Sequence, residues 1–136
     1  FRRVLFRSVM NLVDSSGWLE YFTDGKNADS FSVPLHDITN LIVPTISIYE
    51  VFKVVLRERG ENDALQAAAL MKQGNVKNLT LEISLQAAKF SLENKIPMAD
   101  SIIYTTGKIY NATIWTQDDD FQNLPNVKYF HKENRR

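Results

Sequence analysis

The sequence predicts an α/β protein whose central, mostly parallel sheet of about four or five short strands is flanked by helices on both faces in an α/β/α arrangement. Short apolar runs alternate with longer segments whose apolar residues recur at helical spacing, which is typical of strands joined by crossover helices. The 136 residues suffice for one core but not for two domains. Apolar residues make up 44% and charged residues 24%, as in ordinary globular proteins.

The first expected elements are a strand and a helix. Residues 10–14, MNLVD, form an apolar run that ends in an acid. The following SSGWLEYF has apolar residues at helical spacing, and Ser15 or Ser16 can cap this helix. Residues 23–30 are polar and break the pattern, and we expect a short helical segment at 31–38.

The second strand and its helix follow directly. LIVP at 41–44 predicts the strand, and SIYEVFKVVLRERG predicts a long helix. Ser47 and Glu50 have the spacing of a capping box, and Gly60 is a typical helix terminator.

The second half of the chain continues the alternation. We expect a helix at 62–73, a strand at 76–79, a helix from Thr80, a helix at 99–110 after Pro97, and strands at 112–116 and 127–130. The helix from Thr80 has one apolar face, made of Leu81, Leu85, Ala88 and Leu92.

Composition excludes several kinds of site. The chain has no cysteine, so it has no disulfide, no zinc–thiolate centre and no thiol nucleophile. No apolar run approaches the roughly 20 residues that cross a bilayer. We therefore expect a cytoplasmic protein that does not act at a membrane.

The first residues, FRRVLFRS, differ in character from the rest. They can be back-translated into a run that resembles a sequencing-library adapter, so we treat 1–9 as a non-native extension, 10–131 as the domain and 132–136 as a tail. Without the three arginines of this extension, the basic residues fall from 16 to 13 against 16 acids, and the net charge becomes −3. A polyanionic substrate would then need bound cations or local basic patches.

Four acids occupy related positions in the expected fold. Asp14 and Asp118 follow strands, whereas Glu50 and Asp100 lie in the opening turns of helices. Each acid alone fits an ordinary capping or turn role. In a parallel sheet, however, strand ends and the helix starts after them share the edge where ligands bind, so all four can converge.

Convergent carboxylates repel one another unless a cation lies between them. Oxygen ligands without cysteine or a histidine pair favour Mg²⁺ or Mn²⁺ over zinc. Such sites typically catalyse in-line displacement at phosphorus. The acids therefore point to a nuclease.

The chain resembles the PIN-domain nucleases, especially the VapC toxins of toxin–antitoxin pairs. The resemblance rests on NLVDSSGWLEYF, SIYEVFKVVLRE, PMADSIIYTTGKIYNATIWTQDDDF and NLPNVKYF, and it covers nearly all of 10–130. The sharpest motif is T-x-D-x-D-F, here Thr116, Asp118, Asp120 and Phe121.

The resemblance implies roles for individual residues. The four metal-site acids correspond to Asp14, Glu50, Asp100 and Asp118, and Asp120 is an additional metal ligand. Ser16 and Thr116 are supporting residues. Ser16 either holds a carboxylate or caps the first helix, and Thr116 either orients Asp118 or ends its strand. Asp119 stays unassigned. Lys53 and Arg57, on the helical face of Glu50, either contact the RNA backbone or form a solvated surface.

The resemblance also implies a function and partners. It implies a Mg²⁺- or Mn²⁺-dependent endoribonuclease, a homodimer, and an antitoxin protein whose tail blocks the acidic site. The alternatives are a non-catalytic α/β module that binds a protein partner, and a solitary housekeeping nuclease of the same family. A phospho-accepting receiver domain does not fit, because Asp14 has no paired acid and Asp118 stands in place of the lysine expected late in such domains.

Overall fold

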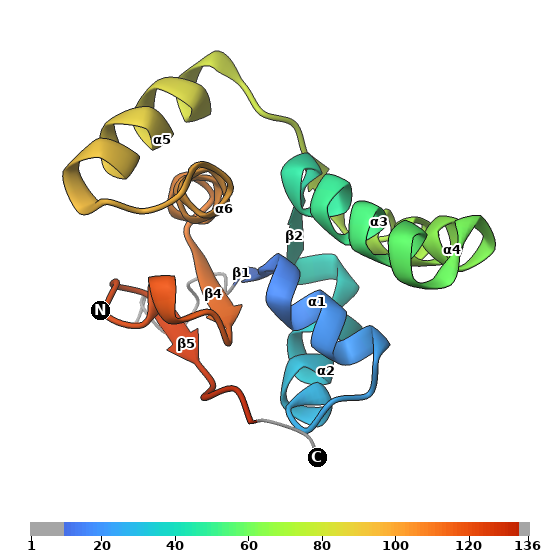
Figure 1. The fold of residues 1–136 in the computed structure, drawn as a ribbon. Coiled ribbons are helices and arrows are strands. Elements are labelled where there is room, and N and C mark those ends of the chain that lie inside the picture. The colour runs from blue at the N-terminus through green and yellow to red at the C-terminus, as the bar shows by residue number, and fades with distance from the viewer. Residues whose placement is uncertain (1–9, 134–136) are drawn as a thin grey trace.

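The computed structural model describes residues 10–133 (Figure 1). The expected N-terminal extension, 1–9, lies outside the described residues, as do 134–136 of the expected tail. The fold class is the predicted one, with a single parallel sheet and helices on both faces.

Five strands form this sheet in the order β3-β2-β1-β4-β5, and every neighbouring pair is parallel. The strands are β1 (Met10–Val13), β2 (Leu41–Pro44), β3 (Asn75–Lys77), β4 (Ala112–Thr116) and β5 (Val127–Tyr129). The helices within 10–133 are α1 (Ser15–Phe22), α2 (Ala28–His36), α3 (Thr45–Arg59), α4 (Glu61–Met71), α5 (Leu81–Asn94) and α6 (Met98–Ile109). Short 3₁₀ helices occupy Ile38–Asn40 and Asp119–Phe121.

The strands bury both faces of the sheet, because successive side chains point to opposite sides. In β1, Val13 packs in one cluster with Trp18 of α1 and Phe31 of α2. Its neighbour Leu12 packs in a second cluster with Ile103 of α6. Helices α1 to α4 therefore contribute to the first core, whereas α5 and α6 cover the other face.

The strand order places one particular pair of strand ends together. The chain leaves β1 toward β2 on one side, and β4 later pairs with β1 on the other side. The carboxyl ends of β1 and β4 therefore flank the point where the strand order reverses, which is the usual place for a ligand in such sheets. Asp14 and Asp118 follow these two strands.

Two predicted helix caps are wrong. Asp14, not Ser15 or Ser16, is the N-cap of α1, and its side chain accepts a hydrogen bond from the backbone N–H of Gly17. Helix α3 begins at Thr45, directly after Pro44, so Ser47 lies inside the helix with its side chain buried. No capping box with Glu50 forms, because β2 leads into α3 without a loop.

The apolar face predicted for α5 exists, but it faces away from the core. Leu81, Leu85 and Leu92 are 76%, 64% and 84% exposed, whereas Ile83 and Ala87 are the buried residues of this helix. Figure 1 shows α5 lying outside α6, so only one side of α5 is covered. No α-helix within 10–133 combines the length and apolar character needed to span a membrane.

Close packing of α1 gives a test of the fold. A Cβ on Gly17 would lie 2.5 Å from Cγ1 of Val13 and 2.8 Å from the ring of Phe31. We expect Gly17→Ala to lower the free energy of unfolding by about 1–3 kcal/mol through overpacking, measured by urea denaturation. The exposed control Gln73→Ala should change it by less than about 0.5 kcal/mol. Equal stability of the two variants would contradict this packing.

Candidate metal centre

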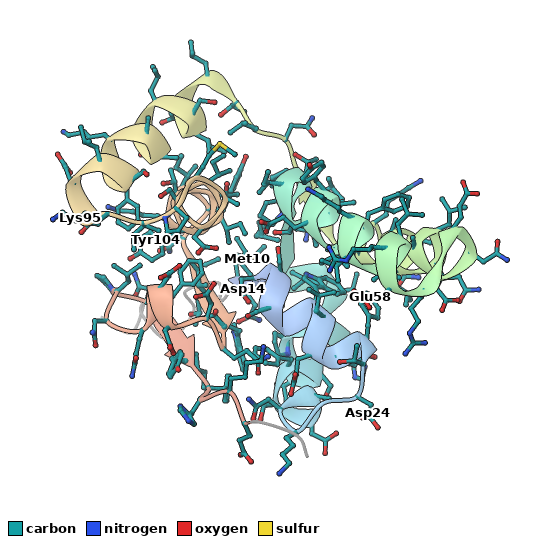
Figure 2. All side chains as sticks on the ribbon, viewed as in Figure 1. Met10, Asp14, Asp24, Glu58, Lys95 and Tyr104 are labelled. Atoms are coloured by element: carbon teal, nitrogen blue, oxygen red, sulfur yellow. The ribbon has the colours of Figure 1, made fainter. Side chains whose placement is uncertain are left out.

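Asp14 is the most buried acid of the candidate site. Its residue is 2% exposed, and it lies where β1 passes into α1, near the middle of the molecule (Figure 2). Its Oδ1 accepts hydrogen bonds from Ser16 Oγ at 2.8 Å and from the Gly17 N–H at 3.0 Å. Its Oδ2 accepts from Thr116 Oγ1 at 2.7 Å. Three donors from α1 and β4 therefore fix this carboxylate.

Thr116 links Asp14 to Asp118. The hydroxyl of Thr116 donates to Asp14 and accepts a hydrogen bond from the backbone N–H of Asp118 at 2.9 Å. Thr116 is fully buried, so its hydroxyl has little freedom to choose other partners. Asp118 in turn caps the 3₁₀ helix Asp119–Phe121, since its Oδ1 accepts from the N–H of Asp120 at 2.9 Å.

Three further carboxylates meet beside Asp14. Asp100, Asp118 and Asp120 each offer an oxygen that lies within 4.8 Å of the other two. Asp100 comes from the first turn of α6, whereas Asp118 and Asp120 follow β4. Asp100 lies close to the other two acids, although it is at least 18 positions away in the chain, because α6 starts at the sheet edge where β4 ends.

Burial and the mutual repulsion of the acids raise the pKa values of two of them. Burial raises the pKa of Asp14 to about 6, although its three hydrogen bonds work in the opposite direction and the Asp118 charge adds to the rise. The pKa of Asp100 is raised to about 8, first by burial and then by the Asp118 charge and a hydrogen bond to Asp120. Without a counter-charge, part of this cluster therefore holds protons near neutral pH.

The donor set fits a hard divalent cation. Carboxylate oxygens from Asp100, Asp118 and Asp120 lie close enough for one ion to contact all three, and such ligands suit Mg²⁺ or Mn²⁺. A cation would lower the pKa of Asp100, because it would offset the neighbouring negative charges that add to the effect of burial.

Glu50 lies outside the group of three. It is half-buried on α3, and its Oε1 accepts a hydrogen bond from Ser15 Oγ at 2.6 Å. This bond joins α3 to the start of α1, next to Asp14. The structure therefore places Glu50 at the border of the cluster, where Ser15 holds it. The sequence did not indicate this hydrogen bond.

Lys53 and Arg57 lie on the exposed surface of α3. The ammonium of Lys53 lies 5.6 Å from the ring centre of Tyr49, and Arg57 Nε lies 3.1 Å from Glu58 Oε2. Both side chains are exposed, as either interpretation of the sequence requires.

The structure distinguishes Asp119 from its neighbours. Asp119 accepts a hydrogen bond from the hydroxyl of Tyr129, at the end of β5, which draws it away from the acids. Asp118 and Asp120, on either side of it, belong to the close group with Asp100. The alternation follows from the 3₁₀ helix, which turns successive side chains in different directions.

One buried polar residue beside the acids was missed. Gln117 is 4% exposed, and its side chain hydrogen-bonds Glu20 of α1 and Asn27 before α2. The strand alternation indicates only that Gln117 points away from Thr116. Its partners are about 90 residues away in the chain, so no local pattern identifies them.

Comparison with known proteins gives a consistent result. The PIN domain family model matches residues 12–127. No curated protein sequence matches the chain.

Several solved structures share the fold. A toxin–antitoxin complex from Klebsiella pneumoniae contains a chain with a TM-score of 0.75 and 18% identity, covering 90% of this chain and 99% of that one. VapC20 of Mycobacterium tuberculosis, a Sarcin-Ricin loop cleaving toxin, has a TM-score of 0.68 and 16% identity over 84% and 94% of the two chains. VapBC2 from Rickettsia felis, bound to a promoter DNA fragment, has a TM-score of 0.68 and 16% identity over 90% and 98%.

The raised pKa values predict a pH dependence of stability. A free aspartate has a pKa near 3.9, so between about pH 4 and pH 8 the folded protein keeps a proton on Asp100 that the unfolded chain releases. Stability in EDTA should therefore fall as pH rises through this window, measured as the thermal midpoint. Asp100→Asn, which cannot titrate, should flatten the decline, whereas the exposed control Asp29→Asn should not. A decline that is unchanged in Asp100→Asn would refute the assignment.

Proposed function

Because this chain belongs to the PIN-domain family, we propose that it is a nuclease, a Mg²⁺- or Mn²⁺-dependent endoribonuclease that acts as the toxin of a toxin–antitoxin pair. The observation that carries this proposal is the close group of Asp100, Asp118 and Asp120 beside the buried Asp14. Its carboxylates converge at the sheet edge where ligands bind in parallel α/β folds. The likeness of the fold to VapC20, a Sarcin-Ricin loop cleaving toxin, supports RNA as the substrate.

Each residue has a distinct task in this proposal. Asp100, Asp118 and Asp120 would hold the cation, and Asp14, which follows β1, would add a further negative charge beside it. When bound, a divalent cation lowers the pKa of a coordinated water and offsets negative charge on the phosphate. The acids must be deprotonated to do this, so cation binding near neutral pH has to displace the proton that the raised pKa of Asp100 retains.

The supporting residues position the acids. Thr116 and Ser16 occupy oxygens of Asp14 and fix its orientation, while Ser15 fixes Glu50. Glu50 lies beside the start of α1, from where it can orient or accept a proton from a water at the edge of the cluster. His36 bonds Tyr21 on the surface of α2 and has no part in this chemistry.

An antitoxin partner fits the charge of the acid cluster. The acid cluster is complementary to an arginine or lysine, which would replace the cation and block the site. The toxin–antitoxin complexes among the structural neighbours support a partner of this kind. A cytoplasmic location follows from this proposal, because RNA substrate and antitoxin are both made there.

We also propose that the protein forms a homodimer through α5. Leu81, Leu85 and Leu92 are exposed on one side of α5, and Leu92 also borders a shallow hollow between α5 and α6 that Ala88 and Met98 help to line. A two-fold axis through the middle of this helix would pack the face against its own copy, as isologous interfaces require. Contiguous exposed leucines of this kind mark interaction sites in water-soluble folds.

Cleavage tests the nuclease proposal. We expect the protein to cut RNA in Mg²⁺ or Mn²⁺ and EDTA to stop it. Asp14→Asn and Asp100→Asn should each lower the rate by more than about 100-fold, because even outer residues around a metal contribute about 10- to 100-fold. Initial rates on a panel of single-stranded and structured RNAs measure this.

A matched control separates chemistry from folding. Asp29→Asn changes an exposed acid of α2 and should cut like the parent. Circular dichroism should show all three variants folded. If Asp14→Asn and Asp100→Asn cut as fast as the parent on every RNA, the site assignment is wrong, and a non-catalytic binding module becomes the better description.

Light scattering tests the dimer. We expect the parent to have the mass of a dimer and Leu85→Asp with Leu92→Asp to have that of a monomer, because charges would be buried at the apolar face. Leu65→Asp, at a 52% exposed leucine of α4, is the matched control and should leave the mass unchanged. If the double variant is still a dimer, α5 does not form the interface.

A further inference from the structure

A groove of about 490 Å³ opens beside the acid cluster, between β5 and the start of α1. It is lined by residues after β4 and by residues at and after the end of β5, together with Ser16 of α1: Gln117, Asp118, Asp119, Asp120, Tyr129, His131 and Lys132. The groove is continuous with the acids, because Asp118 and Asp120 border it and also belong to the close group with Asp100. A molecule in this groove would therefore extend from the site of the cation.

A partly buried hydrogen-bond network holds Gln117, one of the residues that line the groove. Gln117 Oε1 accepts from Asn27 Nδ2 at 2.9 Å, and Gln117 Nε2 donates to Glu20 Oε1 at 3.2 Å. Glu20 Oε2 accepts from the backbone N–H of Asn27 at 2.8 Å. The backbone N–H of Gln117 also donates a hydrogen bond to Ser16 Oγ of α1 at 3.3 Å. These bonds satisfy the amide of Gln117 within the protein, so this part of the lining is rigid.

The segment after β5 is held in place by the same network. Asn27 Nδ2 also donates to the backbone carbonyl of His131 at 3.0 Å. Phe130, the residue before it, stacks on Trp115 and packs edge-on against Phe31. The segment that carries His131 and Lys132 is thus anchored to the body of the domain, although it follows the last strand.

Tyr129 and Asp119 form a pair across the end of the groove. The hydroxyl of Tyr129 donates a hydrogen bond to the carboxylate of Asp119. The half-buried ring of Tyr129 then lines the groove beside two basic side chains. An aromatic ring next to cationic groups is the combination that binds single-stranded nucleic acid.

The charges divide the groove into two parts. Its inner end carries Asp118 and Asp120, which repel a phosphate unless a cation is bound. Its outer end carries His131 and Lys132, which make no ion pair with any acid among the described residues. The outer end is therefore a place where a second phosphate can bind without a metal.

We propose that this groove is the subsite for the nucleotide next to the bond that is cut, with Lys132 and His131 holding its backbone phosphate and the Tyr129 ring lying against its base or sugar. The inference rests on the proposed nuclease function. It adds the path that the bound RNA strand follows from the acid cluster along the surface. It assigns a binding role to residues that the PIN-like acid pattern does not include.

Binding tests the subsite separately from cleavage. A labelled single-stranded RNA of mixed sequence is titrated with Asp100→Asn protein, in which cutting is suppressed, and followed by fluorescence anisotropy at several salt concentrations. Adding Lys132→Ala should weaken binding several-fold and lower the salt slope by about one unit, as expected for one lost phosphate contact. Adding Lys72→Ala, at the end of α4, removes the same charge far from the groove and should change neither quantity.

Kinetics give a second readout. In the parent background Lys132→Ala should raise KM several-fold and leave kcat within about twofold, because the contact exists in the ground state and the transition state alike. Tyr129→Phe keeps the ring and should bind RNA like the parent, whereas Tyr129→Ala should bind more weakly.

The outcomes are distinct. If Lys132→Ala and Lys72→Ala bind RNA equally well with equal salt slopes, the subsite is wrong even when the parent cuts RNA. Absence of salt-dependent RNA binding by the Asp100→Asn protein also overturns it. Selective weakening by Lys132→Ala without cutting of any RNA in the panel would show that the groove binds RNA and would overturn the nuclease proposal alone.

Discussion

The burial of the Asp14 carboxylate is the constraint on which the arrangement of the site depends. A carboxylate that is 2% exposed is costly unless donors surround it. Here the donors come from α1 and from β4, so satisfying one side chain fixes the helix that follows β1 and the strand that pairs with it. The same Thr116 hydroxyl orients the backbone of Asp118. The position of the second acid is thus a consequence of stabilising the first.

Much of the fold follows from local pattern. Apolar runs located all five strands to within a few residues, and helical spacing located the long helices, because each element has to bury its own apolar side. The caps were harder. Asp14 serves as cap and as site acid, and the serines beside it bond carboxylates instead. Spacing such as that of Ser47 and Glu50 indicates a capping box only when the serine is the N-cap, and here the helix already begins at Thr45.

The parts of the site that the sequence could not indicate depend on distant contacts. Four acids were expected at one sheet edge, with Asp120 as a further metal ligand. The close group contains Asp100, Asp118 and Asp120, whereas Asp14 and Glu50 lie beside it, because Asp14 bonds donors in α1 and β4 and Glu50 bonds Ser15. Three consecutive aspartates look alike in the sequence. Only the turn after β4 and the hydroxyl of Tyr129 distinguish Asp119. The spacing of apolar residues in α5 likewise predicted an apolar face but not whether this face points toward the core or toward solvent.

The two outer strands of the sheet set a limit on how partners can attach. β3 and β5 have three residues each, and each carries a lysine, Lys77 or Lys128, stacked on a nearby aromatic ring. Short edges with cationic side chains offer little unpaired backbone for another strand to join. Extension of the sheet by a second chain, and the fibrous aggregation that such extension can start, is therefore disfavoured. Recognition of this protein falls instead to its helices and loops, whose side chains can discriminate between partners in a way that backbone pairing cannot.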